Sequence, residues 1–347
     1  MTLHVTNGDH AGDKLRGFVD GPVIIMADVL HEGPCPPVDG EAWHELRARF
    51  LASDFGAPYE ATKASLTAAD EAMAAALEHG DENVLWFEHD LFDQLQVIRI
   101  LDLLVRLKPD MTAGHVASGF SRTSSLVSLI CIDRFPGIDR FIGLGQLTAA
   151  QLAMLPGTRL PVTRGHFTLA SDAWRAFRSP DPSELLRIAM QLDASRVASS
   201  EGGAALRFLG AALLRFLAEF PSTSNGLSRT EQLALEALAA GPSIAGDLFG
   251  ATQLKEAQPF LGDLPFFDML RRLASANVPL VTVQAGGGDT DLSGQRAAIT
   301  HSGRDVLAGR ADHVRLNGID VWRGGVHLAG SDSSPWRWDE RDETLVS

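Results

Sequence analysis

The chain has 347 residues, 45% of them hydrophobic and 21% charged, so it is long enough for two packed domains and has the composition of neither a disordered nor a membrane protein. Its formal charge of −14 opposes a general affinity for nucleic acid, because phosphate binding depends on clustered Lys and Arg. Two cysteines, Cys35 and Cys131, are too few for a disulfide framework or a zinc site with thiolate ligands. Since no signal segment or membrane span is recognisable, we expect a cytoplasmic protein without a membrane partner.

The first 155 residues alternate between apolar strands and helical patterns. Strands are predicted at 3–6, 23–26, 84–87 and 126–132, and helices at 10–18, 41–52, 68–79, 91–108 and 149–154. Asp9 and Thr67 are predicted as N-caps, Gly80 as a helix stop, and Thr148 with Gln151 as a capping box. Strands that alternate with helices pair in parallel, which predicts a Rossmann-like α/β domain over residues 1–155.

The remainder of the chain is predicted to be mostly helical. Residues 156–220 are predicted to form a linker (156–165) and a helical region with helices at 172–177, 182–192 and 204–220. In residues 221–330, Ser228 and Glu231 form a capping box before helices at 231–240, 244–249 and 264–276, and strands follow at 280–283 and 297–300. This order is typical of a winged helix-turn-helix, so we predict a winged-helix-like domain. Residues 331–347 lack periodicity and are predicted to be an extended or loose tail.

Several segments together resemble one protein family. They are Thr6-Asn7-Gly8-Asp9, residues 28–34, residues 86–94 and residues 143–147, and the similarity continues through 317–320 and 324–328. The combination resembles a bacterial family of uncharacterised proteins, domain of unknown function 1835, over nearly the whole chain. Because no reaction is established for that family, the resemblance implies no particular activity.

Polar side chains follow each of the first three predicted strands. They are Asn7, Gly8 and Asp9, then Asp28, His31 and Glu32, then Glu88, His89, Asp90 and Asp93. The carboxyl ends of parallel strands meet at one edge of a sheet, so we expect these side chains to lie together. Like charges placed there repel by roughly 1 kcal/mol per pair at 4 Å in water. A divalent cation or protonated histidines would offset that repulsion.

Carboxylate oxygens with a little imidazole suit Mg²⁺ or Mn²⁺, ions that usually hold phosphate as well. The sequence therefore predicts a site for a polar small molecule, phosphorylated or nucleotide-like, on which a hydrolase or transferase would act. We assign catalysis to His31, Glu88 and His89, with Glu88 or a histidine as general base, and a metal ligand to Asp90. The predicted ligand-binding residues are Asn7, Gly8, Asp9, Glu32, Asp93 and Arg122.

Each of these residues also has a structural interpretation. Asp9 and Asp90 could be N-caps of the helices that follow them, and Asp93 could be an acidic residue in the first turn that favours the helix dipole. His31 and Glu32 could hold their loop by hydrogen bonds, His89 could be a core histidine, and Arg122 could be a solvated surface charge. Capping and function can coexist, so both interpretations stay open for the aspartates.

Other cofactors and nucleophiles are not supported. Residues 143–145, Gly-Leu-Gly, are half of a dinucleotide fingerprint and follow a late strand, so we expect no NAD, and no haem is expected either. Cys131 lies in an apolar strand and Cys35 between two prolines, so neither is a candidate catalytic thiol.

The predicted winged helix offers an alternative function of another class. Residues 221–330 carry nine Lys and Arg against eleven Asp and Glu, whereas DNA-binding domains usually carry a basic face. Arg271 and Arg272, on the third helix, are the best candidates for nucleic-acid contacts. The alternative is thus a ligand-sensing regulator that binds DNA or a protein partner, and packing against protein is favoured over DNA. A homo-oligomer is compatible with the sequence.

Overall fold

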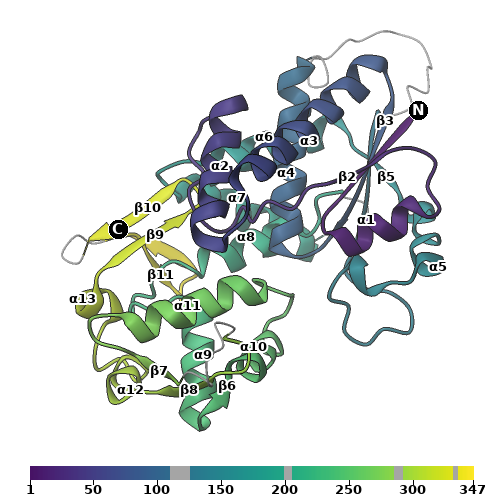
Figure 1. Ribbon diagram of the computed structural model, residues 1–347. Coiled ribbons are helices and arrows are strands. Elements are labelled where there is room, and N and C mark those ends of the chain that lie inside the picture. Colours follow the sequence, from purple (N-terminus) through teal and green to yellow (C-terminus); the bar gives the residue numbers. More distant parts are fainter. Residues whose placement is uncertain (110–125, 199–204, 285–291, 331–334) are drawn as a thin grey trace.

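A five-stranded mixed sheet organises the N-terminal half of the chain. The computed structural model describes residues 1–109, 126–198, 205–284, 292–330 and 335–347 (Figure 1). The strand order is β2-β1-β3-β4-β5, with strands β1 Thr2–Thr6, β2 Val23–Ile25, β3 Glu82–Glu88, β4 Val127–Ile132 and β5 Leu160–Pro161. β1 to β4 are parallel, which confirms the predicted pairing, and β5 adds an antiparallel edge. β5 lies within the stretch predicted as a linker.

The register places the carboxyl ends of four strands at one edge of the sheet. Thr6, the last residue of β1, is paired with Ile25 and with Trp86, and Glu88 at the end of β3 is paired with Ile132. The segments that follow β1, β2 and β3 therefore start side by side.

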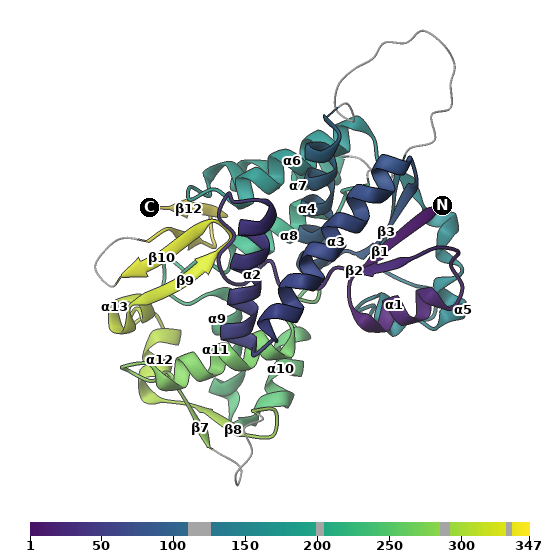
Figure 2. The same ribbon diagram turned by 45° about the horizontal axis from the view of Figure 1, so that its top comes forward.

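Helices cover both faces of this sheet (Figure 1, Figure 2). One face carries α1 Asp9–Arg16, the 3₁₀ turns η2 Leu144–Gln146 and η3 Leu155–Thr158, and α5 Ala149–Leu152. The other carries α2 Gly40–Phe55, α3 Tyr59–His79, α4 Leu91–Leu107, α6 Arg164–Phe177, α7 Ser183–Ala198 and α8 Leu209–Leu217. The alternation along β3 explains this division, because Leu85 and Phe87 join the core with the second set of helices while Val84 and Trp86 pack on the α1 side.

Two predicted N-caps are wrong. α1 is preceded by Gly8, whose φ of 69° suits glycine, and Asp9 is the first helical residue without a capping bond. α3 begins at Tyr59, so Thr67 lies inside the helix. The residues before the predicted start include the good helix formers Glu60, Lys63 and Leu66, which favour helix there. Gly80 ends α3 in the left-handed conformation, and the Thr148 capping box is present, as predicted.

The C-terminal part has a smaller core of its own. It contains α9 Arg229–Ala240, β6 Ser243–Ile244, α10 Ala245–Gln253, α11 Asp263–Ser275, β7 Val281–Gln284, β8 Arg296–Ile299, α12 His301–Leu307 and α13 His313–Asn317. The strands form an antiparallel sheet in the order β6-β8-β7. The capping box of Ser228 and Glu231 at the start of α9 is confirmed.

Two hairpins complete the chain. They are β9 Ile319–Arg323 with β10 Val326–Gly330, and β11 Arg337–Asp339 with β12 Thr344–Val346. Of the two alternatives predicted for the tail, extended or loose, residues 335–347 follow the first, because they form two strands and Trp338, only 5% exposed, packs into the core of the N-terminal half. No helix within the described ranges is long and apolar enough to cross a membrane.

Candidate functional site

A cavity of about 310 Å³ lies at the carboxyl edge of the sheet. Four residues predicted for the site line it, namely Asn7, His31, Glu88 and Asp90. The rest of the wall consists of Leu91, Phe92, Ile142 and the segment Pro259, Phe260, Leu261 and Gly262. Side chains that follow β1, β2 and β3 thus meet at one rim, and a loop between α10 and α11 closes the cavity.

Asp93 links the segments that follow β1 and β3 by hydrogen bonds. Its carboxylate accepts hydrogen bonds from the side-chain amide of Asn7 and from the backbone N–H of Glu88, the latter at 2.5 Å. Asp90 caps α4 by accepting from the N–H of Asp93 at 3.0 Å, so the structural interpretation of Asp90 and Asp93 is confirmed. Asp93 is 1% exposed and Asp90 lines the cavity, so only Asp90 is placed to contact a ligand.

Glu88 is held against the loop after β4. Its Oε1 accepts a hydrogen bond from the backbone N–H of Leu144. Gly143 has a φ of 154°, and a Cβ on it would lie 2.6 Å from Glu88 Oε2. The predicted Gly-Leu-Gly segment therefore lets the backbone approach the Glu88 carboxyl closely.

The three neighbouring carboxyl groups have raised pKa values. Burial, together with the charge of Asp90, raises the pKa of Glu88 to about 8, against the opposing effect of the Leu144 N–H. Burial raises the pKa of Asp90 to about 6, and burial followed by the charges of Glu88 and Asp90 raises the pKa of Asp93 as well. Protonation of carboxyl groups thus relieves the repulsion that we expected a cation or protonated histidines to offset.

His31 is the most unusual residue of the cavity. It is 4% exposed and contacts the rings of Phe92 and Phe260 at centroid distances of 5.9 and 6.0 Å. Neither of its ring nitrogens has a hydrogen-bond partner among the described residues. Burial, followed by the charges of Arg47 and Arg323, lowers the pKa of His31 to about 3. The imidazole is therefore neutral, and the expectation of a protonated histidine at this position is wrong because the ring is cut off from water.

The loop that carries His31 is fixed by a buried ion pair. Arg47 of α2 is fully buried and donates to both carboxylate oxygens of Asp28, the shortest contact being 2.7 Å. The same guanidinium donates to the carbonyls of Val29, Glu32 and Pro34. Asp28 is consequently a structural residue, and Arg47 determines the course of the loop.

Several predicted site residues lie away from the cavity. His89 is 5% exposed and packs against the rings of Phe141 and Phe208, in the manner of a core histidine, and burial lowers its pKa. Glu32 faces Arg323 at 3.7 Å, and burial raises its pKa. Asp9 is exposed and lines a groove beside β2 and α3. Gly8 precedes α1 as its N-cap, and Arg122 lies outside the described residues.

The cavity residues that sequence reasoning missed come mostly from the distant segment 259–262. Leu261 has a φ of 61°, a conformation that costs energy for a residue with a Cβ. Gln253 pins the segment, because its side-chain amide donates to the Phe260 carbonyl at 2.5 Å and accepts from the Phe260 N–H at 3.1 Å. Pro259 and Gly262 gave a turn signal here, but nothing local linked that turn to the sheet.

Metal binding by protein groups alone is not supported by the geometry. Within the described ranges, no group of three or more His, Cys, Asp or Glu side chains is arranged to hold a metal ion. The carboxyl groups of Glu88 and Asp93 are directed at backbone N–H groups, which leaves Asp90 without a convergent partner.

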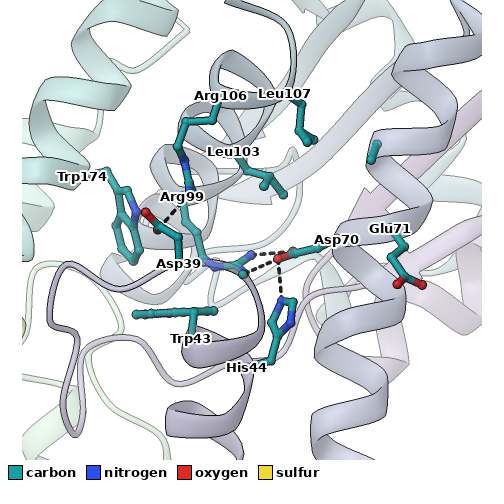
Figure 3. Close-up of a pocket in the computed structure, with 12 residues that line it drawn as sticks. Asp39, Trp43, His44, Asp70, Glu71, Arg99, Leu103, Arg106, Leu107 and Trp174 are labelled. Carbon is teal, nitrogen blue, oxygen red and sulfur yellow. Dashed lines mark hydrogen bonds and ion pairs between the residues drawn. The ribbon is translucent and has the colours of Figure 1, made fainter.

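A second pocket, of about 190 Å³, lies among α2, α3, α4 and α6 (Figure 3). Asp70 of α3 accepts two hydrogen bonds from Arg99 of α4, at 2.8 and 3.1 Å, and one from His44 of α2 at 2.8 Å. Trp43 and Trp174 form an edge-to-face pair beside them. Because Asp70 and Arg99 satisfy each other, this network joins three helices and is a structural feature.

A scan of the chain against protein-family models finds no match, and a search of the curated proteins finds no relative. The family resemblance suggested by the sequence therefore stays a prediction.

Proposed function

We propose that the cavity binds a polar small molecule, phosphorylated or nucleotide-like, and catalyses hydrolysis or group transfer on it. The observation that carries this proposal is His31, a buried neutral imidazole with both nitrogens unbonded at the wall of a cavity. Buried polar groups usually have hydrogen-bond partners, so an imidazole without one among the described residues, at a cavity wall, supports a ligand contact there. Glu88 and Asp90, with raised pKa values, lie at the same cavity, as is typical of active sites.

The carboxyl groups of Glu88 and Asp90 are suited to different catalytic roles. At neutral pH, Glu88 retains its proton because its pKa is about 8, whereas Asp90, with a pKa of about 6, is mostly ionised. Pairs of acids whose environments separate their pKa values typically serve as general acid and general base. Glu88 would protonate a leaving group, in place of the base role predicted from sequence, and Asp90 would accept a proton from water. His31, whose pKa is about 3, would act as a neutral hydrogen-bonding group and not as a base.

In this proposal a divalent ion would bind only together with the ligand. Mg²⁺ and Mn²⁺ commonly use one or two carboxylates together with phosphate oxygens of the substrate. Asp90 could supply one such carboxylate, and the acid–base roles described above do not depend on the ion.

We predict that His31→Ala abolishes ligand-induced stabilisation. A panel of nucleosides, nucleotides and phosphosugars, each with and without Mg²⁺ or Mn²⁺, is screened by thermal shift, since a ligand at 100 times its Kd adds about 2.7 kcal/mol of stability. The variant should lower the affinity for any hit at least tenfold, because the ligand loses its hydrogen bond to the imidazole of His31. His79→Ala, an exposed histidine at the end of α3, is the matched control. Equal binding by wild type and His31→Ala would count decisively against the site.

The architecture proposed for the chain is a Rossmann-like domain joined to a winged-helix-like module. Support for the first comes from the strand order 2-1-3-4 in parallel, with the ligand site beyond the carboxyl ends. Support for the second comes from the order of α9, β6, α10, α11, β7 and β8. The similarity to domain of unknown function 1835 is part of the same proposal.

One observation favours a second candidate function, that of a ligand-sensing regulator. Residues 259–262 form a wall of the cavity, and α11 begins at Asp263 directly after them. A bound ligand would thus touch the segment that leads into the candidate recognition helix, which carries Arg271 and Arg272. This arrangement could couple ligand occupancy to binding of DNA or a protein partner.

Contacts of α11 make the DNA version the less favoured one. Arg271 and Arg272 both pair with Asp268, at 3.4 and 2.7 Å. Pro265, Asp268 and Arg272 line a pocket whose other side includes the end of α2. Figure 2 shows the end of α2 near α11. That face of the helix is directed at the N-terminal half.

We therefore predict weak DNA binding that changes less than threefold in Arg271→Ala and Arg272→Ala. Binding to mixed-sequence duplex DNA is measured by fluorescence anisotropy between about 50 and 200 mM salt, a range over which six to ten phosphate contacts would cost 10³–10⁵ in affinity. Arg175→Ala, an exposed arginine on α6, serves as control. A steep salt slope together with a tenfold loss in either α11 variant would favour the DNA-binding regulator.

A further inference from the structure

The charge around the cavity restricts the chemistry of its ligand. None of the described residues that line it is a lysine or arginine. The guanidinium groups whose charges act on His31 are committed elsewhere: Arg47 to Asp28, Arg323 to Glu32, and Arg215 to Glu219 and Glu256. The described wall therefore offers no cation that could bind a phosphate group.

The helix starts at the same rim carry acidic residues. α4 is capped by Asp90 and has Asp93 in its first turn, and α1 has Asp9 in its first turn. A free helix N-terminus attracts phosphate. Carboxyl groups at these positions either accept hydrogen bonds from the N–H groups that a phosphate would use or repel its negative charge. A phosphate group of the ligand therefore belongs outside the cavity, or requires a metal ion.

The cavity instead combines flat apolar walls with a short polar edge. Leu91, Phe92, Ile142 and Phe260 provide the apolar surface. Glu88 and Asp90 provide acceptors and, in the protonated acid, a donor. His31 lies beside them at the wall, and its buried ring nitrogens have no hydrogen-bond partner among the described residues. A planar ring that carries adjacent donors and acceptors along one edge matches both features, as aromatic and carboxyl groups do in sites that bind bases.

We propose that the cavity binds the base of a nucleoside-like molecule, a planar nitrogen heterocycle with an exocyclic amine, and leaves any phosphate outside. This inference rests on the proposed function, because it names the ligand class of the same site. The amine and the neighbouring ring nitrogen face the carboxyl groups of Glu88 and Asp90 and the imidazole of His31, while the ring faces Phe92 and Phe260.

Titration calorimetry with adenosine, cytidine, uridine, AMP and ribose 5-phosphate tests the inference in metal-free buffer. We expect adenosine or cytidine to bind, uridine to bind at least tenfold more weakly because it lacks the amine, and AMP to bind within threefold of adenosine. Ribose 5-phosphate should give no heat. Asp90→Asn and His31→Ala should each weaken nucleoside binding at least tenfold, and Glu78→Gln, on the exposed side of α3, should not.

Two kinds of failure are distinguishable. If ribose 5-phosphate binds, or AMP binds at least tenfold more tightly than adenosine, and the signal is lost in His31→Ala, then the site is real and the inferred ligand class is wrong. If none of the five compounds binds, the inferred ligand class is wrong as well. The wider panel of phosphosugars and nucleotides with Mg²⁺ then decides the proposed function separately. Circular dichroism of each variant confirms that loss of binding is not loss of fold.

Discussion

Replacing Glu88 by glutamine is expected to stabilise the protein at pH 8, by about 4 kcal/mol relative to the wild type, and to change its stability little at pH 5. The pKa of Glu88 is about 8 in the folded chain, against an ordinary value of 4.5, because the carboxyl group is buried beside Asp90. Between these two values the unfolded chain releases a proton that the folded chain keeps. The unfolded state then binds fewer protons, so the free energy of unfolding falls as pH rises through this window. Glutamine is neutral at every pH and removes the decline.

Urea unfolding at half-unit steps from pH 5 to pH 9 measures the effect. The difference between variant and wild type should grow from about pH 5 and level off near pH 8, with Glu78→Gln as a control that removes an exposed carboxylate from α3. Glu88→Gln should at the same time lose the proton donor of the proposed reaction. A gain in stability with a loss of activity is the behaviour expected of a functional residue kept in an unfavourable environment. If the free energy of unfolding changes with pH in the same way in Glu88→Gln and the wild type, then the pKa of Glu88 is not raised in the folded protein.

The rim of the sheet was predictable because its signals are local. The apolar run of β3 ends at Glu88, Asp90 caps the next helix, and parallel strands bring the ends of β1, β2 and β3 together. Asn7, His31, Glu88 and Asp90 follow from this rule and line one cavity. Helix starts were less predictable, since α3 begins after Pro58 with no side-chain cap for its first turn.

The remainder of the site depends on contacts between distant parts of the chain. Nothing near Asp28 indicates that Arg47 of α2 will neutralise it, and nothing near Phe260 places that ring on His31. His89 differs from Glu88 by one position, yet its ring packs between Phe141 and Phe208 while Glu88 lines the cavity. The sequence predicts repulsion among the clustered carboxyl groups. That repulsion is relieved by raised pKa values, which depend on burial and cannot be read from the sequence.

Arg47→Met is expected to lower the free energy of unfolding by about 3–5 kcal/mol, the cost of leaving one member of a buried ion pair without its partner. Arg47 is fully buried and Asp28 is 2% exposed, so water cannot replace the lost donors. The variant also leaves the carbonyls of Val29, Glu32 and Pro34 without this partner. Because these residues flank His31, ligand-induced stabilisation should disappear even where the variant remains folded.

Arg49→Met provides a matched control. Arg49 lies two positions further along α2, but its side chain is 69% exposed and pairs only with Glu45 at the surface, so its loss should cost less than about 0.5 kcal/mol. The double variant Asp28→Asn with Arg47→Met separates charge from packing. It should recover about 1–2 kcal/mol of the single-variant loss, because the uncompensated buried carboxylate is gone. If Arg47→Met costs no more than Arg49→Met, the ion pair does not hold the loop, and the position of His31 at the cavity must have another cause.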